Sequence, residues 1–256
     1  MESRITARDL VRAVLVVAGA VAQVTFAFAP DLLGFERSIG GLSQEFQTLL
    51  VPAGFVFAIW LPLYGGSIAF AVFHALPAQL RDPLFRSVGW LAALSFLANA
   101  AWAIHQPLFG PGWVSFALIL AIVAPLLVAI GVVRRAGRLR FWRNLALAPL
   151  FGLAGWITLA SPVAFSLALR LSGLEPDRVS EMTLALTILA VWALIAGLLI
   201  WRARSIVFTA AILWGLAGVA VINEARGVDL LSMAAVLSGG LLLVLALGAK
   251  FRVGWA

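Results

Sequence analysis

Eight apolar stretches occupy most of this 256-residue sequence, and each is long enough to cross a lipid bilayer. A hydrocarbon core of about 30 Å needs roughly 20 apolar residues in a helix. Hydrophobic residues make up 63% of the chain and charged residues only 11%, which leaves no segment for a soluble domain. We therefore predict an all-α polytopic membrane protein with transmembrane helices near residues 10–29, 51–73, 87–105, 113–133, 144–169, 182–201, 205–223 and 230–249.

Basic residues fall mainly in every second gap between these stretches. Of the eighteen Lys and Arg residues, fourteen lie before the first stretch, after the even-numbered stretches or at the C-terminal end, and four lie in the other gaps. Loops rich in Lys and Arg stay in the cytoplasm. We therefore expect eight crossings, both termini in the cytoplasm, and a bacterial inner (cell) membrane as the location.

The net charge of +7 has two readings, nucleic-acid binding or membrane topology. The densest basic cluster, residues 134–143, lies between two spans and contains Phe141 and Trp142. Such a segment is typical of a loop facing an anionic leaflet beside an interfacial aromatic belt. We expect membrane lipid as a partner and no nucleic acid.

Enzyme and metal motifs are absent from the sequence. There is no cysteine, the two histidines (His74 and His105) lack metal-ligand spacing, and no serine-histidine-acid order or phosphate-binding glycine loop occurs. No charged residue falls at the centre of a span, which disfavours ion pumps. We expect no required cofactor, no metal site and no catalytic residue.

Aromatic residues line one face of the second span. Phe57, Trp60 and Tyr64 are three and four residues apart, so they share a helix face. An indole in mid-membrane needs a buried hydrogen-bond acceptor or a cavity with some polar content. Trp60 lies close to mid-span, and Trp156 in the fifth span raises the same question, as do Trp192 and Trp214.

The third span carries a polar residue, Asn99, on the same face as Trp102. A buried amide must find its partners in protein or ligand, since lipid offers none. It either forms a hydrogen bond to a neighbouring helix, which stabilises the bundle by about 1 kcal/mol, or it contacts a ligand. Both readings remain open at this stage.

Four segments in order resemble the TspO/translocator protein family, the tryptophan-rich sensory proteins. Residues 52–64 resemble its second-helix signature, Asn99 and Trp102 its third-helix motif, Gly112 and Trp113 the opening of its fourth helix, and residues 149–160 its fifth-helix segment. The resemblance covers residues 10–169. It implies a five-helix bundle, frequently homodimeric, whose pocket opens toward the loop after the first helix and binds tetrapyrroles, sterol-like or other flat apolar molecules.

The resemblance, together with the aromatic face of the second span, gives a set of candidate ligand-binding residues: Phe57, Trp60, Tyr64, Asn99, Trp102, Trp113, Trp156 and Ala160. An asparagine expected about two turns after Trp156 is replaced by Ala164, next to Pro162. The three spans after residue 180 have no counterpart in the short family members. We therefore divide the chain into a TspO-like bundle, residues 1–170, and a three-helix transmembrane extension, residues 171–256.

The connection at residues 30–50 is the longest between spans and is predicted to lie on the non-cytoplasmic side. Its length favours a lid or ligand-binding loop over a disordered tether, although the tether remains an alternative. This connection contains three acidic residues, Asp31, Glu36 and Glu45, and one basic residue, Arg37. The excess of negative charge disfavours the entry of an anionic ligand past the connection.

The functional prediction is an integral membrane ligand-binding protein, a sensor or translocator for a flat apolar or tetrapyrrole-like molecule in an aromatic-lined intramembrane pocket. A porphyrin or another tetrapyrrole is the ligand that the resemblance implies. The alternatives are a membrane enzyme that oxidatively modifies a bound pigment, and a membrane scaffold without a small-molecule ligand.

Overall fold

A computed structural model describes residues 4–33, 41–42, 45–173 and 177–251. Within these ranges the secondary structure is helical, and eight helical segments are long and apolar enough to cross a membrane, which confirms the predicted fold class. The elements are α1 (Ala7–Leu33), the 3₁₀ helix η1 (Gly54–Ile59), α3 (Trp60–His74), α4 (Pro77–Arg81), α5 (Pro83–Phe109), α6 (Trp113–Arg135), α7 (Phe141–Leu171), α8 (Arg178–Ala203), α9 (Ile206–Ala225) and α10 (Asp229–Phe251).

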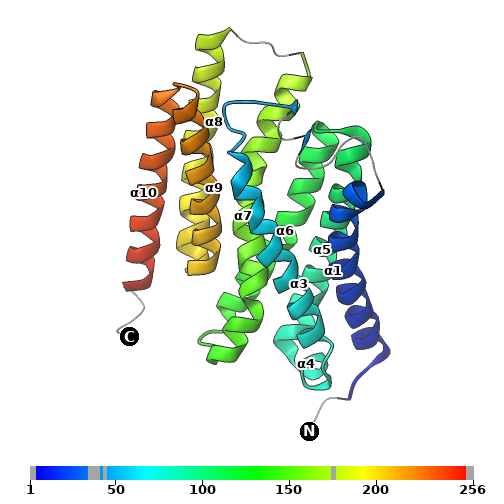
Figure 1. The fold of residues 1–256 in the computed structure, drawn as a ribbon. Helices are drawn as coiled ribbons and strands as arrows, with labels where there is room; N and C mark the ends of the chain where they lie inside the picture. Colours follow the sequence, from blue (N-terminus) through cyan, green and yellow to red (C-terminus); the bar gives the residue numbers. More distant parts are fainter. Residues whose placement is uncertain (1–3, 34–40, 43–44, 174–176, 252–256) are drawn as a thin grey trace.

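The first five spans form a closed ring. Helix α1 packs on α5, α5 on α6, α6 on α7, α7 on α3, and α3 again on α1. Outside this ring α9 packs on α7, and α10 packs on both α9 and α8, so the last three spans form a layer on one side (Figure 1). The interior of the ring is the place where side chains from five helices can converge.

The second span differs from the continuous helix predicted over residues 51–73. It begins as η1 and becomes α-helical at Trp60, whose N–H bonds to the carbonyls of Phe57 and Ala58. The carbonyl of Val56 does not accept from the Trp60 N–H, and the indole N–H of Trp214 in α9 bonds to it at 2.8 Å. The N–H of Ala53 likewise bonds to the carbonyl of Gly218 in α9 at 3.1 Å.

Glycines bring α7 and α9 into close contact. A Cβ added to Gly155 would overlap the backbone carbonyl of Phe208, and one added to Gly215 would overlap the side chain of Leu159. Small residues at such positions allow the backbones of membrane helices to approach, which increases van der Waals contact. The α7–α9 interface therefore depends on the absence of side chains at these two positions.

Buried charges join the helices at one end of the ring, the end at which α1, α5, α7 and α9 begin, which we call the basic end. The Asp9 carboxylate accepts hydrogen bonds from Arg12 at 2.8 Å and from Arg86 at 2.9 Å. Arg12 is almost fully buried and also donates to the His74 ring at 3.2 Å and to the Leu80 carbonyl at 3.1 Å. These contacts tie together α1, α3, α4 and α5.

In the sequence, Arg12 is one of the fourteen basic residues that indicate topology, and its cluster with Asp9 and Arg86 is not predicted. Asp9 three residues before Arg12 is the spacing of an ion pair on one helix face, and it was the available signal. Nothing in the local sequence shows that His74 and Arg86 converge on the same point, since this depends on how α1 docks against α3 and α5.

Replacing Gly155 with Ala is expected to destabilise the protein by about 1–3 kcal/mol, because the new methyl group meets backbone, which cannot rotate away. Reversible unfolding in detergent measures the change. Gly131→Ala in α6 is the matched control, since open space surrounds that position; equal stability of the two variants would contradict the packing argument.

Asp9→Asn is expected to cost about 3–5 kcal/mol, because it leaves the buried Arg12 guanidinium without a counter-charge. The free energy of unfolding measured as above tests this. Asp177→Asn is the control, because exposed Asp177 caps α8 by accepting from the Ser180 N–H and Asn caps a helix equally well. A small loss at Asp9, similar to that of the control, would show that the cluster contributes little.

Candidate functional site

A cavity of about 100 Å³ lies inside the five-helix ring, toward the end opposite to the basic end. Every helix of the ring except α1 contributes to its wall, together with the connection after α1. The residues that line it include Leu42, Val51, Phe57, Trp60, Trp102, Gln106, Ser115, Ile119, Trp156, Ala160, Val163, Ala164 and Leu167.

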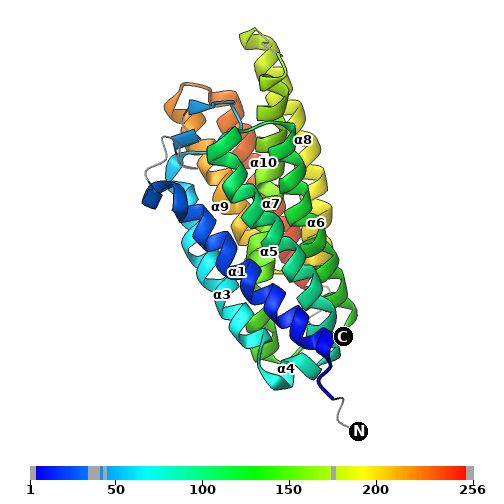
Figure 2. The same cartoon turned by 90° about the vertical axis from the view of Figure 1, so that its right-hand side faces the viewer.

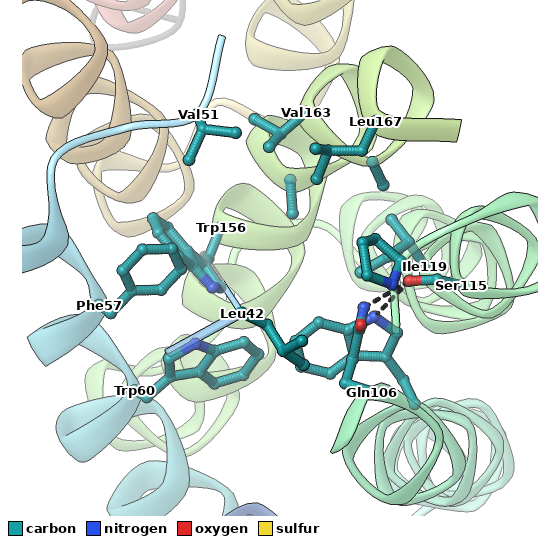
Figure 3. Close-up of a pocket in the computed structure, with 14 residues that line it drawn as sticks. Leu42, Val51, Phe57, Trp60, Gln106, Ser115, Ile119, Trp156, Val163 and Leu167 are labelled. Atoms are coloured by element: carbon teal, nitrogen blue, oxygen red, sulfur yellow. Dashed lines mark hydrogen bonds between the residues drawn. The ribbon is translucent and has the colours of Figure 1, made fainter. Parts of the chain in front are cut away.

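Aromatic rings form one wall of the cavity (Figure 3). Trp60 packs edge-on against Trp156 with 6.1 Å between ring centroids, and it stacks on Trp102 at 6.0 Å. Phe57 meets Trp156 edge-on at 5.9 Å. Offset stacks and edge-to-face pairs are the favoured geometries of aromatic rings, so these four side chains hold one another in place.

The opposite wall has a polar centre at Ser115. Its hydroxyl oxygen accepts hydrogen bonds from the indole N–H of Trp102, at 3.1 Å, and from the side-chain amide of Gln106. Figure 3 shows Ser115 and Gln106 across the cavity from Phe57 and Trp60, with Leu42 between them. A hydroxyl has two acceptor lone pairs and one proton, so with both lone pairs occupied Ser115 retains only its O–H to donate.

Trp156 differs from two other tryptophans inside the spans, Trp192 and Trp214. The N–H of Trp192 bonds to the Thr158 carbonyl at 2.8 Å, and that of Trp214 bonds to Val56. The N–H of Trp156 is buried and has no hydrogen-bond partner among the described residues. This donor belongs to a side chain that lines the cavity.

The structure brings five of the predicted site residues together in the cavity wall, namely Phe57, Trp60, Trp102, Trp156 and Ala160. Tyr64 lies one turn below, buried and stacked on Trp60 with 5.0 Å between ring centroids, and is not part of the lining. Ala164, which replaces the asparagine expected from the resemblance, does line the cavity, so this part of the wall is apolar.

Asn99 and Trp113 lie outside the cavity lining. The Asn99 amide is fully buried and donates to the Gln23 side chain of α1 at 2.7 Å, which corresponds to the helix-bonding alternative for this residue. Trp113 is 49% exposed, contacts Phe165, and donates to the Ser172 hydroxyl at 2.7 Å. Its position fits an interfacial belt residue.

Sequence reasoning missed Gln106 and Ser115. Gln106 lies one turn after Trp102 on the same helix face, and Ser115 lies near the start of α6, so both were visible as polar residues near span ends. Their convergence depends on the α5–α6 turn. Of the connection 30–50, α1 takes up residues to Leu33, while residues 34–40 and 43–44 lie outside the described part; the predicted lid role stays a prediction.

These features define a polytopic α-helical membrane protein with an aromatic-lined cavity between its helices. A family model described as TSPO-like protein matches residues 12–248, so the chain belongs to that family. The match includes α8–α10 almost entirely, whereas the resemblance seen in the sequence covered residues 10–169 only. Comparisons with curated proteins and with solved structures gave no significant match.

The division at residue 170 remains a prediction, and the hydrogen bonds from α9 to the segment 53–56 cross that boundary. Among the described residues, no group of three or more metal-ligating side chains lies close enough to hold a metal ion.

Ser115→Ala is expected to destabilise the protein by about 1–3 kcal/mol, because two buried donors lose their acceptor at once. Ser161→Ala is the matched control, since the Ser161 hydroxyl bonds only to the Ile157 carbonyl of its own helix. Unfolding in detergent compares the two. If the two substitutions lower the free energy of unfolding by the same small amount, the polar centre does not stabilise this wall.

Proposed function

We propose that the cavity is a binding site for a flat, mostly apolar molecule that carries a hydrogen-bond acceptor, and that the protein senses or translocates this molecule. The observation that carries the proposal is the Trp156 indole N–H, which is buried in the cavity wall without a partner. An unsatisfied buried donor costs about 1–3 kcal/mol. A ligand carbonyl or carboxylate at this point would remove that cost.

The composition of the wall supports this choice of ligand. Four aromatic rings and several aliphatic side chains offer flat contact surface, while the Trp156 N–H is a donor without a protein partner and the Ser115 hydroxyl keeps its O–H to donate. Ligand sites combine predominantly apolar walls with a few polar groups that fix orientation. A planar molecule with an acceptor at its edge matches both features, and a tetrapyrrole with carboxylate side chains is one member of this class.

The size of the cavity sets a condition on that ligand. Its volume of about 100 Å³ is below the roughly 300–1,000 Å³ of typical ligand sites. A tetrapyrrole therefore requires the cavity to widen, whereas a single small ring needs less movement. Leu42 and Val51 precede η1 rather than belonging to a packed span, so displacing them breaks fewer backbone hydrogen bonds than moving a helix.

The membrane orientation expected from the distribution of basic residues implies from which side the ligand reaches the cavity. With both termini in the cytoplasm of a bacterial cell, the cavity lies in the outer half of the membrane, and a ligand reaches it from the non-cytoplasmic side. The homodimer implied by the family resemblance remains a separate prediction, and the cavity lies within one chain.

An oxidative membrane enzyme is the second candidate, because Trp60 and Trp156 are electron-rich rings in contact with one another. It is distinguished by the fate of the ligand. A binding protein returns the ligand unchanged, whereas an enzyme changes the absorption spectrum of a bound pigment with time, in light or with oxygen. A scaffold binds no ligand in this cavity.

Titration with protoporphyrin IX in detergent tests the proposal by quenching of tryptophan fluorescence. We expect saturable quenching, and Trp156→Phe is expected to weaken binding about 5- to 10-fold, since it removes one hydrogen-bond donor while keeping an aromatic ring. Trp60→Phe/Trp156→Phe is expected to weaken it further. If both variants bind protoporphyrin IX with the same dissociation constant as the unsubstituted protein, this cavity is not the binding site.

Trp90→Phe is the matched control for the titration. Trp90 lies in α5, 42% exposed and outside the cavity lining, so the same loss of one indole there leaves binding unchanged. Asn99→Ala is unsuitable as a ligand probe, because it breaks the buried hydrogen bond between α5 and α1. Mass spectrometry of the recovered porphyrin separates binding from oxidation.

A further inference from the structure

A second hollow lies on the lipid-facing side of the bundle, between α6 and α8, with α7 as its floor. It is an open groove of about 530 Å³, and its lining includes Phe116, Leu127, Phe165, Val191 and Leu199. Helix α8 packs mainly on α10 and touches α6 and α7 only sparsely. Helices α6, α7 and α8 run along the same side of the bundle (Figure 2). The groove is separate from the cavity inside the ring, with which it shares no lining residue.

The polar groups in this groove are already satisfied within the protein. The Trp192 N–H bonds to the Thr158 carbonyl, the Thr158 hydroxyl to the Ala154 carbonyl at 2.7 Å, and the Thr187 hydroxyl to the Thr183 carbonyl at 2.7 Å. A polar ligand would therefore lose its hydration here without gaining a hydrogen bond. The groove is suited to a hydrocarbon chain.

The length of the groove fits one lipid chain. Along α8 its lining runs from Leu184 to Leu199, which is about 22 Å at 1.5 Å per residue. Half of the hydrocarbon core measures about 15 Å. The groove is therefore longer than one leaflet of the hydrocarbon core is thick, so an extended acyl chain from one leaflet can lie inside it along the whole chain.

Arginines lie beyond the end of the groove that is nearest the basic end, a place that we call its mouth, and none of them lines the groove itself. Arg134 of α6 donates to the carbonyl of Ala203, the last residue of α8, at 2.6 Å from its Nε and through a second N–H. Arg204 lies close enough to repel the charge of Arg134, and Arg135 and Arg202 are exposed beside them. Arg134 is left with three of its five N–H donors.

No acidic residue of the nearby sequence offsets these charges. The chain contains no Asp or Glu between Asp82 and Glu175, nor between Glu181 and Glu224. Repelling guanidinium groups at a membrane surface attract an anion, and basic pockets between transmembrane helices bind the head groups of anionic lipids. The groove therefore joins an apolar channel to a positively charged mouth.

We propose that this groove is a binding site for one phospholipid with an anionic headgroup. Its acyl chain lies between α6 and α8 on the floor of α7, and its phosphate contacts the guanidinium groups of Arg134 and Arg204. Such a lipid fills the space between α8 and the five-helix ring, which protein contacts fill only partly. It thereby connects the last three spans to the ring.

A second copy of the chain is a poorer occupant of the same groove. In a symmetric pair that spans the membrane in parallel, the same surface of both subunits meets, so the arginines of each copy would face those of the other at the same depth. Like charges directly opposite each other disfavour that pairing. The charge at the mouth therefore favours a lipid.

The test measures the first lipid bound to the full-length protein in detergent by native mass spectrometry. Phosphatidylglycerol is compared with phosphatidylcholine carrying the same acyl chains. We expect at least tenfold tighter binding of phosphatidylglycerol, and a loss of about 30-fold in its affinity in Arg134→Gln/Arg204→Gln, as expected for two basic residues near an anionic group. Equal affinity for the two lipids would overturn the proposal.

Two further variants separate charge from structure at the mouth. Arg138→Gln/Arg140→Gln removes the same charge from the α6–α7 connection, which contributes no residue to the groove lining, and is expected to keep the preference for phosphatidylglycerol. Arg134→Lys/Arg204→Lys keeps the charge and is expected to bind within about threefold of the unsubstituted protein. If the lysine variant loses as much as the glutamine variant, the arginines act on structure, and the headgroup contact is disproved.

The position of the acyl chain is tested on α8. Val191 lines the groove and Leu194 does not, although both face lipid. Val191→Trp is expected to fill the groove and lower the affinity for both lipids at least fivefold, while Leu194→Trp leaves both unchanged. Equal binding by the two variants would place the lipid elsewhere and overturn the proposed site.

Discussion

Lipid offers no hydrogen-bonding partner, so polar groups inside a bundle of this kind depend on other protein groups for satisfaction. That constraint accounts for most of the buried polar contacts described. The indoles of Trp192 and Trp214 bond to backbone carbonyls of other spans, and Asp9 holds the arginine pair at the basic end. The N–H of Trp156 is one of the buried polar atoms without a partner among the described residues, and its side chain lines the cavity, which supports the proposed ligand site.

The same constraint explains what could be predicted from the sequence. Only a helix satisfies its backbone within one segment of membrane, so hydropathy was enough to predict eight spans. The aromatic spacing of the second span indicated Phe57 and Trp60, and the family resemblance added Trp102, Trp156 and Ala160, all of which line the cavity. Ser115 and Gln106 were not predictable, because the rotation of α6 relative to α5 decides whether they meet. The placement of Asn99 on Gln23 rather than in the cavity was also decided by helix docking.

The last three spans are connected to the cavity through η1. The indole N–H of Trp214 in α9 donates to the carbonyl of Val56 within η1. Phe57 follows directly and Trp60 lies one turn further, so α9 supports the segment that presents two of the aromatic rings to the cavity. The family match through residue 248 agrees with this arrangement, in which α8–α10 contribute to one assembly with the ring.

The two ends of the ring differ in how readily they can change shape. At the basic end, Arg12 and Arg86 bind one carboxylate and one carbonyl that belong to different elements, so separating α1 from α5 there would strand buried charges. At the opposite end the cavity is bounded by stacked rings and by Leu42 and Val51, whose contacts are apolar and non-directional. Apolar contacts can be exchanged for equivalent contacts with a ligand, whereas ion pairs cannot. If the proposed ligand binds, the cavity end is the part of the ring that can widen at the lower cost, while the ion pairs of the basic end stay in place.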